Sequence, residues 1–195
     1  MKTIGLTGGI GSGKSFVAQL FANHGIICYN CDARAKELNN THKRIIEQLT
    51  ERYGTNAYTN GKLNRQLIAQ QIFNNKTELQ WINNLIHPIV HDDFVEWRSR
   101  QTGNFVLIES AILIDSGFSK LCDKVISVEA PLATRIARVM RRDNLTEEQV
   151  RQRISSQASD SYRRANADFV ITNGEKNDTE NQVDMIIAHI NGISI

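Results

Sequence analysis

The sequence predicts an α/β fold, a three-layer α/β/α domain around a five-stranded parallel sheet. Five short apolar segments, typical of strands buried in a parallel sheet, alternate with helical segments along the chain. A glycine-rich loop joins the first of these strands to the first helix, as expected of βα units whose strands run parallel. The 195 residues suffice for one such domain with a small insertion.

Short apolar runs bounded by turn-forming residues indicate the strands. We predict them at residues 3–6, 26–29, 104–108, 124–128 and 168–171. Gly25 ends the first helix, because glycine readily adopts the left-handed conformation of a helix C-terminus. Asn64 and Thr146 are candidate N-caps, and Pro131 begins the helix that continues through Arg142. The other predicted helices cover residues 33–38, 41–50, 77–97 and 179–190.

Residues 60–100 are predicted to form a helical insertion between the second and third strands. Apolar residues recur there at helical spacing from Leu79 to Trp97. The turn-rich stretch 53–61 before it is typical of a surface connection. Pro88 should bend or break the long helix, since proline removes a backbone donor. The core of this single unit then comprises residues 1–59 and 101–195, with a lid at about 138–160.

Composition excludes several classes of protein. Lysine and arginine number 23 against 21 acidic residues, and a net charge of +2 gives no reason to expect a nucleic-acid partner. No segment reaches the roughly 18 apolar residues of a membrane span, and the early glycine-rich loop leaves no room for a signal peptide. Three cysteines cannot form a disulfide framework, and Cys28 and Cys31 lack the partners of a zinc site. We expect a cytoplasmic protein.

Residues 8–15 complete the pattern of a P-loop, a phosphate-binding loop between a strand and a helix. The glycines let backbone amides turn towards a phosphate, Lys14 reaches the β- and γ-phosphates, and the Ser15 hydroxyl ligates Mg²⁺. The positive end of the helix dipole strengthens phosphate binding. The predicted nucleotide-binding residues are Gly9, Ile10, Gly11, Ser12, Gly13, Lys14 and Ser15.

Three carboxylates follow the second and third predicted strands, at the edge where ligands of open parallel sheets lie. Phosphoryl transfer needs a carboxylate that orients or deprotonates the acceptor hydroxyl. Asp32 is the best-placed candidate, and its alternative role is a helix cap. Glu109 is either a ligand of Mg²⁺ or a solvated acid at a strand end. Asp115 contacts the acceptor or caps a helix.

Arginines are dense within nineteen residues of the chain, at positions 135, 138, 141, 142, 151 and 153. Such density suits a lid that closes over ATP, because the guanidinium fork stabilises a transferring phosphoryl group. We predict that Arg138 and Arg142, one helical turn apart, act in catalysis; the alternative is a solvated helix face. His87 and His91 have the spacing of metal ligands, but packing near Pro88 is the simpler interpretation.

Several motifs together resemble the dephospho-coenzyme A kinase family over essentially the whole chain. The segment from Ile4 to Ser15 is similar to the family's N-terminus almost letter for letter, and residues 85–88 match its Leu-x-His-Pro. Residues 28–34 resemble a segment whose second aspartate is taken as the catalytic base, here Asp32. Further matches are Arg142 with Asp143, Arg153 with Gln157, and residues 167–173, which are followed by Gly174.

The resemblance implies a P-loop kinase fold and phosphorylation of the ribose 3′-hydroxyl of dephospho-coenzyme A by ATP, with Mg²⁺ as cofactor. Asn173 and Gly174 then bind the nucleotide, while Asp32, His87 and Asp115 bind the acceptor. Two departures stand out. The family's first aspartate before Asp32 is Asn30 here, and the acid at position 115 is Asp instead of Glu, which weakens the transfer of a role to Asp115.

Two other functions fit parts of the sequence. Another P-loop kinase of a nucleotide or small metabolite would share the loop, although the long helical insertion favours a large acceptor. A regulatory GTPase is distantly indicated by residues 75–78, Asn-Lys-Thr-Glu. That tetrapeptide opens a helix instead of following a strand and carries Glu where Asp is required. No Asp-x-x-Gly follows the third strand.

Overall fold

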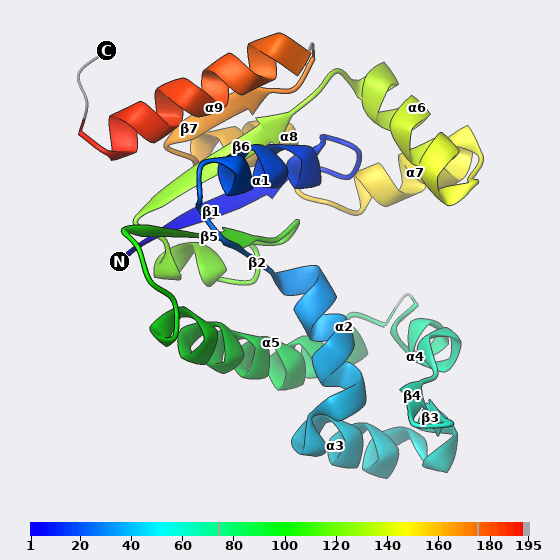
Figure 1. Cartoon of the computed structure of the whole chain (residues 1–195). Coiled ribbons are helices and arrows are strands. Elements are labelled where there is room, and N and C mark those ends of the chain that lie inside the picture. Colours follow the sequence, from blue (N-terminus) through cyan, green and yellow to red (C-terminus); the bar gives the residue numbers. More distant parts are fainter. Residues whose placement is uncertain (74, 175, 193–195) are drawn as a thin grey trace. The chain divides into compact units, whose positions relative to one another are not determined.

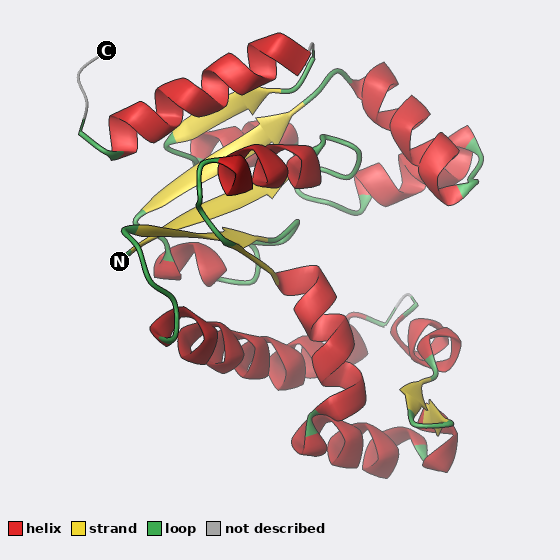
Figure 2. Ribbon diagram, viewed as in Figure 1, coloured by secondary structure: helices red, strands yellow, loops and turns green. Residues whose placement is uncertain are grey.

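The computed structural model describes residues 1–73, 75–174 and 176–192. They form two compact units, one from Met1–Asn30 together with the chain from Gln101 onward, and one from Cys31–Arg100. We call these the sheet unit and the helical unit and describe each by itself. Figure 2 shows that the long strands belong to the sheet unit.

The sheet unit contains the predicted five-stranded parallel sheet. Its strand order is β2-β5-β1-β6-β7, and every neighbouring pair runs parallel (Figure 1). The strands are β1 (Lys2–Gly8), β2 (Cys28–Asn30), β5 (Phe105–Glu109), β6 (Lys124–Glu129) and β7 (Phe169–Thr172). Each overlaps one predicted strand, so the predicted fold class is confirmed.

Helices surround this sheet. They are α1 (Lys14–Asn23), α6 (Leu132–Asp143), α7 (Glu147–Ser155), α8 (Asp160–Ala165) and α9 (Lys176–Ile190), with the short 3₁₀ helix η2 (Phe118–Leu121). Thr146 caps α7 with a complete capping box, because its side chain accepts from the Gln149 amide and the Gln149 side chain accepts from the Thr146 amide. The sequence did not indicate α8, which is only six residues long.

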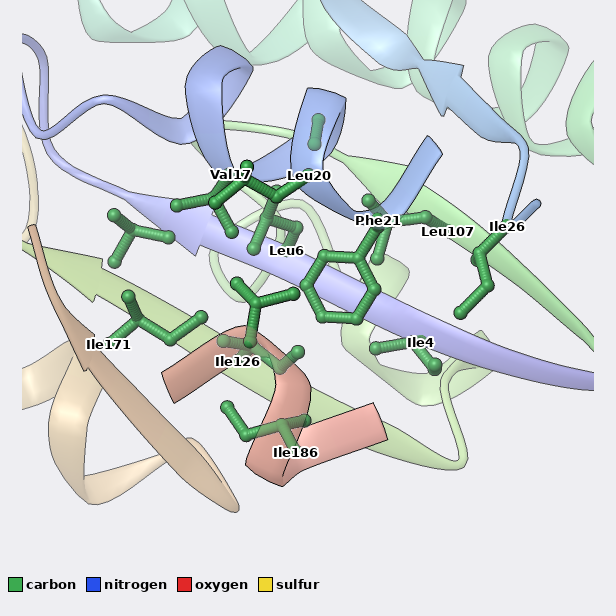
Figure 3. Packing of buried hydrophobic residues seen from close by; sticks show 13 residues of the cluster. Ile4, Leu6, Val17, Leu20, Phe21, Ile26, Leu107, Ile126, Ile171 and Ile186 are labelled. Atoms are coloured by element: carbon green, nitrogen blue, oxygen red, sulfur yellow. The ribbon is translucent and has the colours of Figure 1, made fainter. Parts of the chain in front are cut away.

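The two faces of β1 are covered differently. Ile4 and Leu6 face a buried apolar cluster with α1 and α9, in which Phe21 and Ile186 lie over the sheet (Figure 3). Burying a side chain of this kind contributes roughly 1.5–3 kcal/mol. Gly5 points to the opposite face, where an added Cβ would lie 2.6 Å from Leu113 and 2.8 Å from the Cys122 sulfur. The segment after β5 therefore packs directly on the backbone of β1. Together with α8, this segment forms the layer on the second face of the sheet.

The helical unit begins at Cys31, about thirty residues before the insertion that the sequence indicated. It contains α2 (Cys31–Thr41), α3 (Lys43–Tyr53), η1 (Thr55–Ala57), the strand pair β3 (Tyr58–Thr59) and β4 (Lys62–Leu63), α4 (Arg65–Ile72) and α5 (Lys76–Ser99). The boundary differs because α2 packs on α3 and on α5. Residues 31–59 therefore share a core with residues 60–100.

Two local features of the helical unit differ from expectation. Helix α5 runs through Pro88 as one element and is not broken there. The turn-rich stretch contains the hairpin β3–β4, whose turn residues Asn60 and Gly61 both have positive φ, as a two-residue hairpin turn requires. Two-residue strands are too short for an apolar alternation to reveal them in the sequence. The predicted cap Asn64 is confirmed, since its side chain accepts from the Leu67 amide.

Candidate functional site

The P-loop leads from the end of β1 into α1 within the sheet unit. Gly11 and Gly13 have φ of 77° and 94°, which glycine adopts without the strain that a side chain would add. Gly13 is the N-cap of α1. The first amides of a helix have no partner inside it and point out of its N-terminal end, where they form a site for an anion.

Lys14 and Ser15 begin α1 and lie where the sequence predicts a cation and a metal ligand. The Lys14 ammonium donates to the Gly8 carbonyl at 2.8 Å, so the side chain folds back over the loop. The Ser15 hydroxyl donates to a carboxylate oxygen of Glu109 at 3.3 Å. The other oxygen of Glu109 accepts from the Asn30 amide at 2.8 Å. The register of the sheet explains this meeting, because Glu109 of β5 pairs with both Leu6 of β1 and Asn30 of β2.

The donor set at this edge fits a magnesium ion. Mg²⁺ binds hard oxygen ligands and keeps several water molecules, so a hydroxyl and a carboxylate suffice beside phosphate oxygens. Ser15 and Glu109 supply that pair of oxygens. Among the described residues, no group of three histidine, cysteine, aspartate or glutamate side chains comes together as a metal site. The spacing of His87 and His91 therefore does not create such a cluster.

Asn173 anchors the loop from the end of β7. Its side-chain amide donates to the Ser12 carbonyl at 2.8 Å, and its carbonyl oxygen accepts from the Thr179 hydroxyl at 3.2 Å. The same amide nitrogen fills the space that a Cβ at Gly13 would need, at 1.8 Å. The buried side chain of Asn173 therefore supports the shape of the loop.

A cavity of about 420 Å³ lies beside this anchor. Its lining residues are Gly13, Phe16, Arg138, Arg141, Asn173 and Gly174. Arg138 donates to the carbonyls of Gly11 and Ser12, each at 3.4 Å, so the structure brings this predicted residue to the loop. Phe16 was not singled out from the sequence, where it is one of many apolar residues of an amphipathic helix.

The other arginines of the dense segment mostly pair with acids. Arg142 is exposed and pairs with Asp143, which also accepts from Arg153. These guanidinium groups, Arg142 first, hold the pKa of Asp143 below its usual value. Arg151 pairs with Glu147 on the surface of α7. The structure therefore brings Arg138, but not Arg142, into contact with the P-loop.

Arg135 differs from its neighbours because its side chain is buried. Its Nε donates to the Ile10 carbonyl at 2.9 Å, while the Ile10 amide donates to the side chain of Gln157 at 2.8 Å. Both polar backbone atoms of Ile10 are thus bonded to the segment from α6 to α8. The sequence places Arg135 on the same helix as the other arginines but gives no signal of its burial.

The predicted acceptor-side residues are divided between the two units. Asp32 is exposed in the first turn of α2, and His87 is half-buried in α5, so both belong to the helical unit. Burial lowers the pKa of His87. Asp115 is exposed in the turn after β5 and belongs to the sheet unit.

Two sequence motifs have structural explanations. The side chain of Asn75 caps α5 by accepting a hydrogen bond from the Glu78 amide. The Glu78 carboxylate accepts hydrogen bonds from Arg52 and Tyr53. Residues 75–78 therefore form the start of a helix and do not form the guanine-binding motif of a GTPase. The thiol of Cys28 is not tuned for reaction. Burial, followed by the charge of Glu109, raises the pKa of Cys28 to about 12, whereas a reactive thiol needs a lowered pKa.

Comparisons with known proteins agree on one family. The family model for dephospho-CoA kinase matches residues 2–178. A dephospho-CoA kinase of Porphyromonas gingivalis is 45% identical over 174 residues, which cover 89% of this chain and 86% of the relative. Within the described residues, no helix combines the length and hydropathy needed to cross a bilayer.

Solved structures agree on the fold. The crystal structure of TT1252 from Thermus thermophilus superposes with a TM-score of 0.85 at 28% identity, covering 100% of this chain and 98% of that one. A dephospho-CoA kinase from Campylobacter jejuni has the same fold, with a TM-score of 0.60 at 21% identity over 97% of each chain. With the family model spanning most of the sequence, the chain belongs to the dephospho-CoA kinase family.

Proposed function

We propose that this chain transfers the γ-phosphoryl group of ATP to the ribose 3′-hydroxyl of dephospho-coenzyme A, giving coenzyme A and ADP. The acceptor oxygen forms a bond to the γ-phosphorus, the bond from that phosphorus to the β,γ-bridging oxygen breaks, and the hydroxyl proton leaves to a base. Family membership supports this reaction. The structural observation that carries it is the P-loop with Lys14 folded over it and Ser15 bonded to Glu109.

The sheet unit holds the nucleotide in this proposal. The loop from Gly9 to Ser15 binds the phosphates, and Lys14 neutralises charge on the β- and γ-phosphates. The Ile10 amide donates to Gln157 and the Ser12 amide to the Gly9 carbonyl, so the phosphate contacts come from other amides of the loop. The cavity beside Asn173 and Gly174 accommodates the base, with Phe16 and Arg138 offering an apolar and a cationic surface to a planar ring. Arg138 is the arginine already in contact with the loop, so it is the first candidate to stabilise charge on the transferring phosphoryl group.

Ser15 and Glu109 would hold Mg²⁺, with Asn30 orienting the carboxylate. Such an ion neutralises phosphate charge during transfer. Asn30 matters to this arrangement because its amide donates one hydrogen bond and carries no charge. The carboxylate of Glu109 is therefore fixed in direction while it keeps an oxygen facing Ser15.

Residues of both units bind the acceptor in this proposal. We assign to Asp32 the orientation of the ribose 3′-hydroxyl and the acceptance of its proton. Its exposure in the first turn of α2 leaves the carboxylate accessible to a ligand. His87 and Asp115 are assigned to acceptor binding, and the segment 138–160, with Arg138 and Arg142, to a lid that excludes water. We further propose that the enzyme works in the cytoplasm, without a nucleic-acid or membrane partner; the small net charge of +2 supports this.

A coupled assay of ADP release with rival acceptors tests the proposal. Dephospho-coenzyme A, AMP and shikimate are supplied in turn with ATP and Mg²⁺, and the product is checked by mass for a phosphate on the acceptor. We expect transfer to dephospho-coenzyme A with kcat/KM at least about a hundredfold above either rival, since a site built for the larger acceptor gains contacts that the rivals lack. A preference for AMP or shikimate would contradict the proposal.

A further inference from the structure

Two buried arginines lie against the first part of the P-loop. Arg135 of α6 and Arg163 of α8 are only 2% and 3% exposed. A Cβ added to Gly9 would lie 2.1 Å from an Arg135 guanidinium nitrogen and 2.8 Å from one of Arg163. Both guanidinium groups therefore occupy the space beside the backbone of Gly9 that a side chain would need.

One carboxylate joins these arginines. Asp160 accepts from Nη1 of Arg135 at 2.9 Å and from Nη2 of Arg163 at 2.5 Å. Arg135 also binds the Ile10 carbonyl, and Arg163 binds the Ala158 carbonyl. We call Arg135, Asp160 and Arg163 the buried triad after its two buried guanidinium groups; the side chain of Asp160 is 43% exposed. Through this triad, α6 and α8 contact the loop: Arg135 donates a hydrogen bond to Ile10, and both arginines pack against Gly9.

The buried triad carries an excess of positive charge. Two guanidinium groups share one carboxylate, and the remaining acid near by, Glu129, already pairs with Arg164. In the part of the chain that the structure describes, Nη2 of Arg135 and Nε of Arg163 are buried without a hydrogen-bond partner. Burial lowers the pKa of Arg135; the charge of Asp160 offsets part of this effect, and the charge of Arg163 adds to it. Burying charge in this way is unfavourable unless something compensates for it.

A polyphosphate bound by the loop would supply that compensation. The triad lies against the backbone of Gly9 and Ile10, in the same loop that would hold the phosphates. Opposite charges attract more strongly through a protein interior than through water, because the effective dielectric constant is lower. We propose that Arg135 and Arg163 are positioning residues for nucleotide binding, which fix Gly9 and Ile10 and place unbalanced positive charge beside the loop that holds the phosphates.

The proposal rests on the proposed function only in taking the loop as an ATP site. Its test therefore measures binding of ATP alone, without an acceptor, by titrating a fluorescent ATP analogue. Arg135→Gln removes one cation and leaves Arg163 paired with Asp160. We expect the dissociation constant to rise about tenfold, while kcat at saturating ATP changes by less than about threefold. Arg135→Lys keeps the charge and should recover part of the affinity.

A matched control separates this effect from a general loss of charge. Arg100→Gln removes an exposed arginine that pairs with Glu96 outside the lid, and we expect ATP binding as in the wild type. Melting curves without ligand should place both variants within a few degrees of the wild type, because in Arg135→Gln the carboxylate of Asp160 keeps Arg163 as its partner and is not left unpaired. Arg163→Gln, measured in the same way, provides a second test if Arg135→Gln does not fold.

A double variant tests the contact itself. Gly9 does not have a positive φ, so Gly9→Ala is opposed mainly by the guanidinium groups of the triad. We expect Gly9→Ala to weaken ATP binding strongly in the wild type and much less in the Arg135→Gln background. Additive effects of the two changes, or wild-type ATP affinity in Arg135→Gln, would overturn the proposal. Transfer to dephospho-coenzyme A by the wild type is measured separately, so failure of the proposed function is distinguishable.

Discussion

The sheet unit buries two of its arginines, whereas two paired arginines of the helical unit, Arg34 and Arg52, are partly exposed. In the sheet unit the side chains of Arg135 and Arg163 are 3% and 4% exposed and lie against the P-loop. In the helical unit those of Arg34 and Arg52 are 36% and 38% exposed, and they pair with Asp93 and Glu78. Pairs at the surface contribute only about 0–1 kcal/mol.

The P-loop is held in shape by buried side chains, whereas Asp32, the proposed acceptor-side carboxylate, is exposed. The shape of the P-loop depends on buried hydrogen bonds within one unit, from Asn173 on one side and Arg135 on the other. Asp32 in the helical unit is exposed in the first turn of its helix. Changes at the P-loop and at the residues that anchor it should therefore alter ATP affinity. Changes at Asp32 and His87 in the helical unit should alter turnover or acceptor affinity and leave ATP affinity unchanged.

The largest effect is expected at Asp32. Asp32→Asn keeps the size of the side chain and removes the proton acceptor, so kcat should fall by about 10² to 10⁴. ATP affinity, measured by titration without acceptor, should stay within about twofold. A variant that binds ATP poorly but has a normal kcat at saturating ATP would mean that Asp32 binds the nucleotide and is not the base.

Lys14→Ala, in the sheet unit, should impair the use of ATP. Loss of the ammonium removes charge that meets the β- and γ-phosphates, and we expect kcat/KM for ATP to fall by at least about a hundredfold. The fold should persist, because the ammonium contacts the loop carbonyl of Gly8 and not the apolar core. Circular dichroism and melting curves check the fold. A variant that keeps more than half the activity would exclude the phosphate assignment.

The proposed lid arginines, Arg138 and Arg142, test whether residues of the sheet unit can affect phosphoryl transfer more than ATP binding. Replacing Arg138 and Arg142 together with Ala should lower phosphoryl transfer about tenfold or more and raise the ratio of ATP hydrolysis to transfer, because water is less well excluded. Binding of ATP should weaken less than transfer. Arg100→Ala, which removes an exposed arginine outside the lid, is the control. Transfer at the wild-type rate would mean that the two arginines form only a solvated face.

The smallest effect concerns His87 and pH. Because burial lowers the pKa of His87 in the folded protein, the unfolded chain binds a proton more readily near its ordinary pKa of about 6.5. Stability should therefore decrease as the pH falls through and below this value. His87→Asn should flatten that part of the curve, measured as melting temperature from pH 8 to pH 5. The exposed His91→Asn is the control, and ATP affinity should be unchanged in both variants.

Local patterns predicted the strands, the P-loop and the N-caps Asn64 and Thr146, because each depends on neighbouring residues. Long-range packing decided the rest. The burial of Arg135 depends on Asp160, twenty-five residues away. The start of the helical unit at Cys31 depends on contacts of α2 with α5, and no nearby turn marks it. Neither the roles of Asp32 and His87 nor those of Arg138 and Arg142 follow from such packing, and they remain predictions.

Helix α5 contains both tryptophans of the chain, Trp81 and Trp97. The guanidinium of Arg52 lies 4.2 Å from the centre of the Trp81 ring, and Phe94 stacks on Trp97. The sheet unit has no tryptophan. Intrinsic tryptophan emission is therefore a label-free signal of the helical unit alone, and comparison with far-ultraviolet circular dichroism during denaturation would reveal whether the two units unfold in one step or separately.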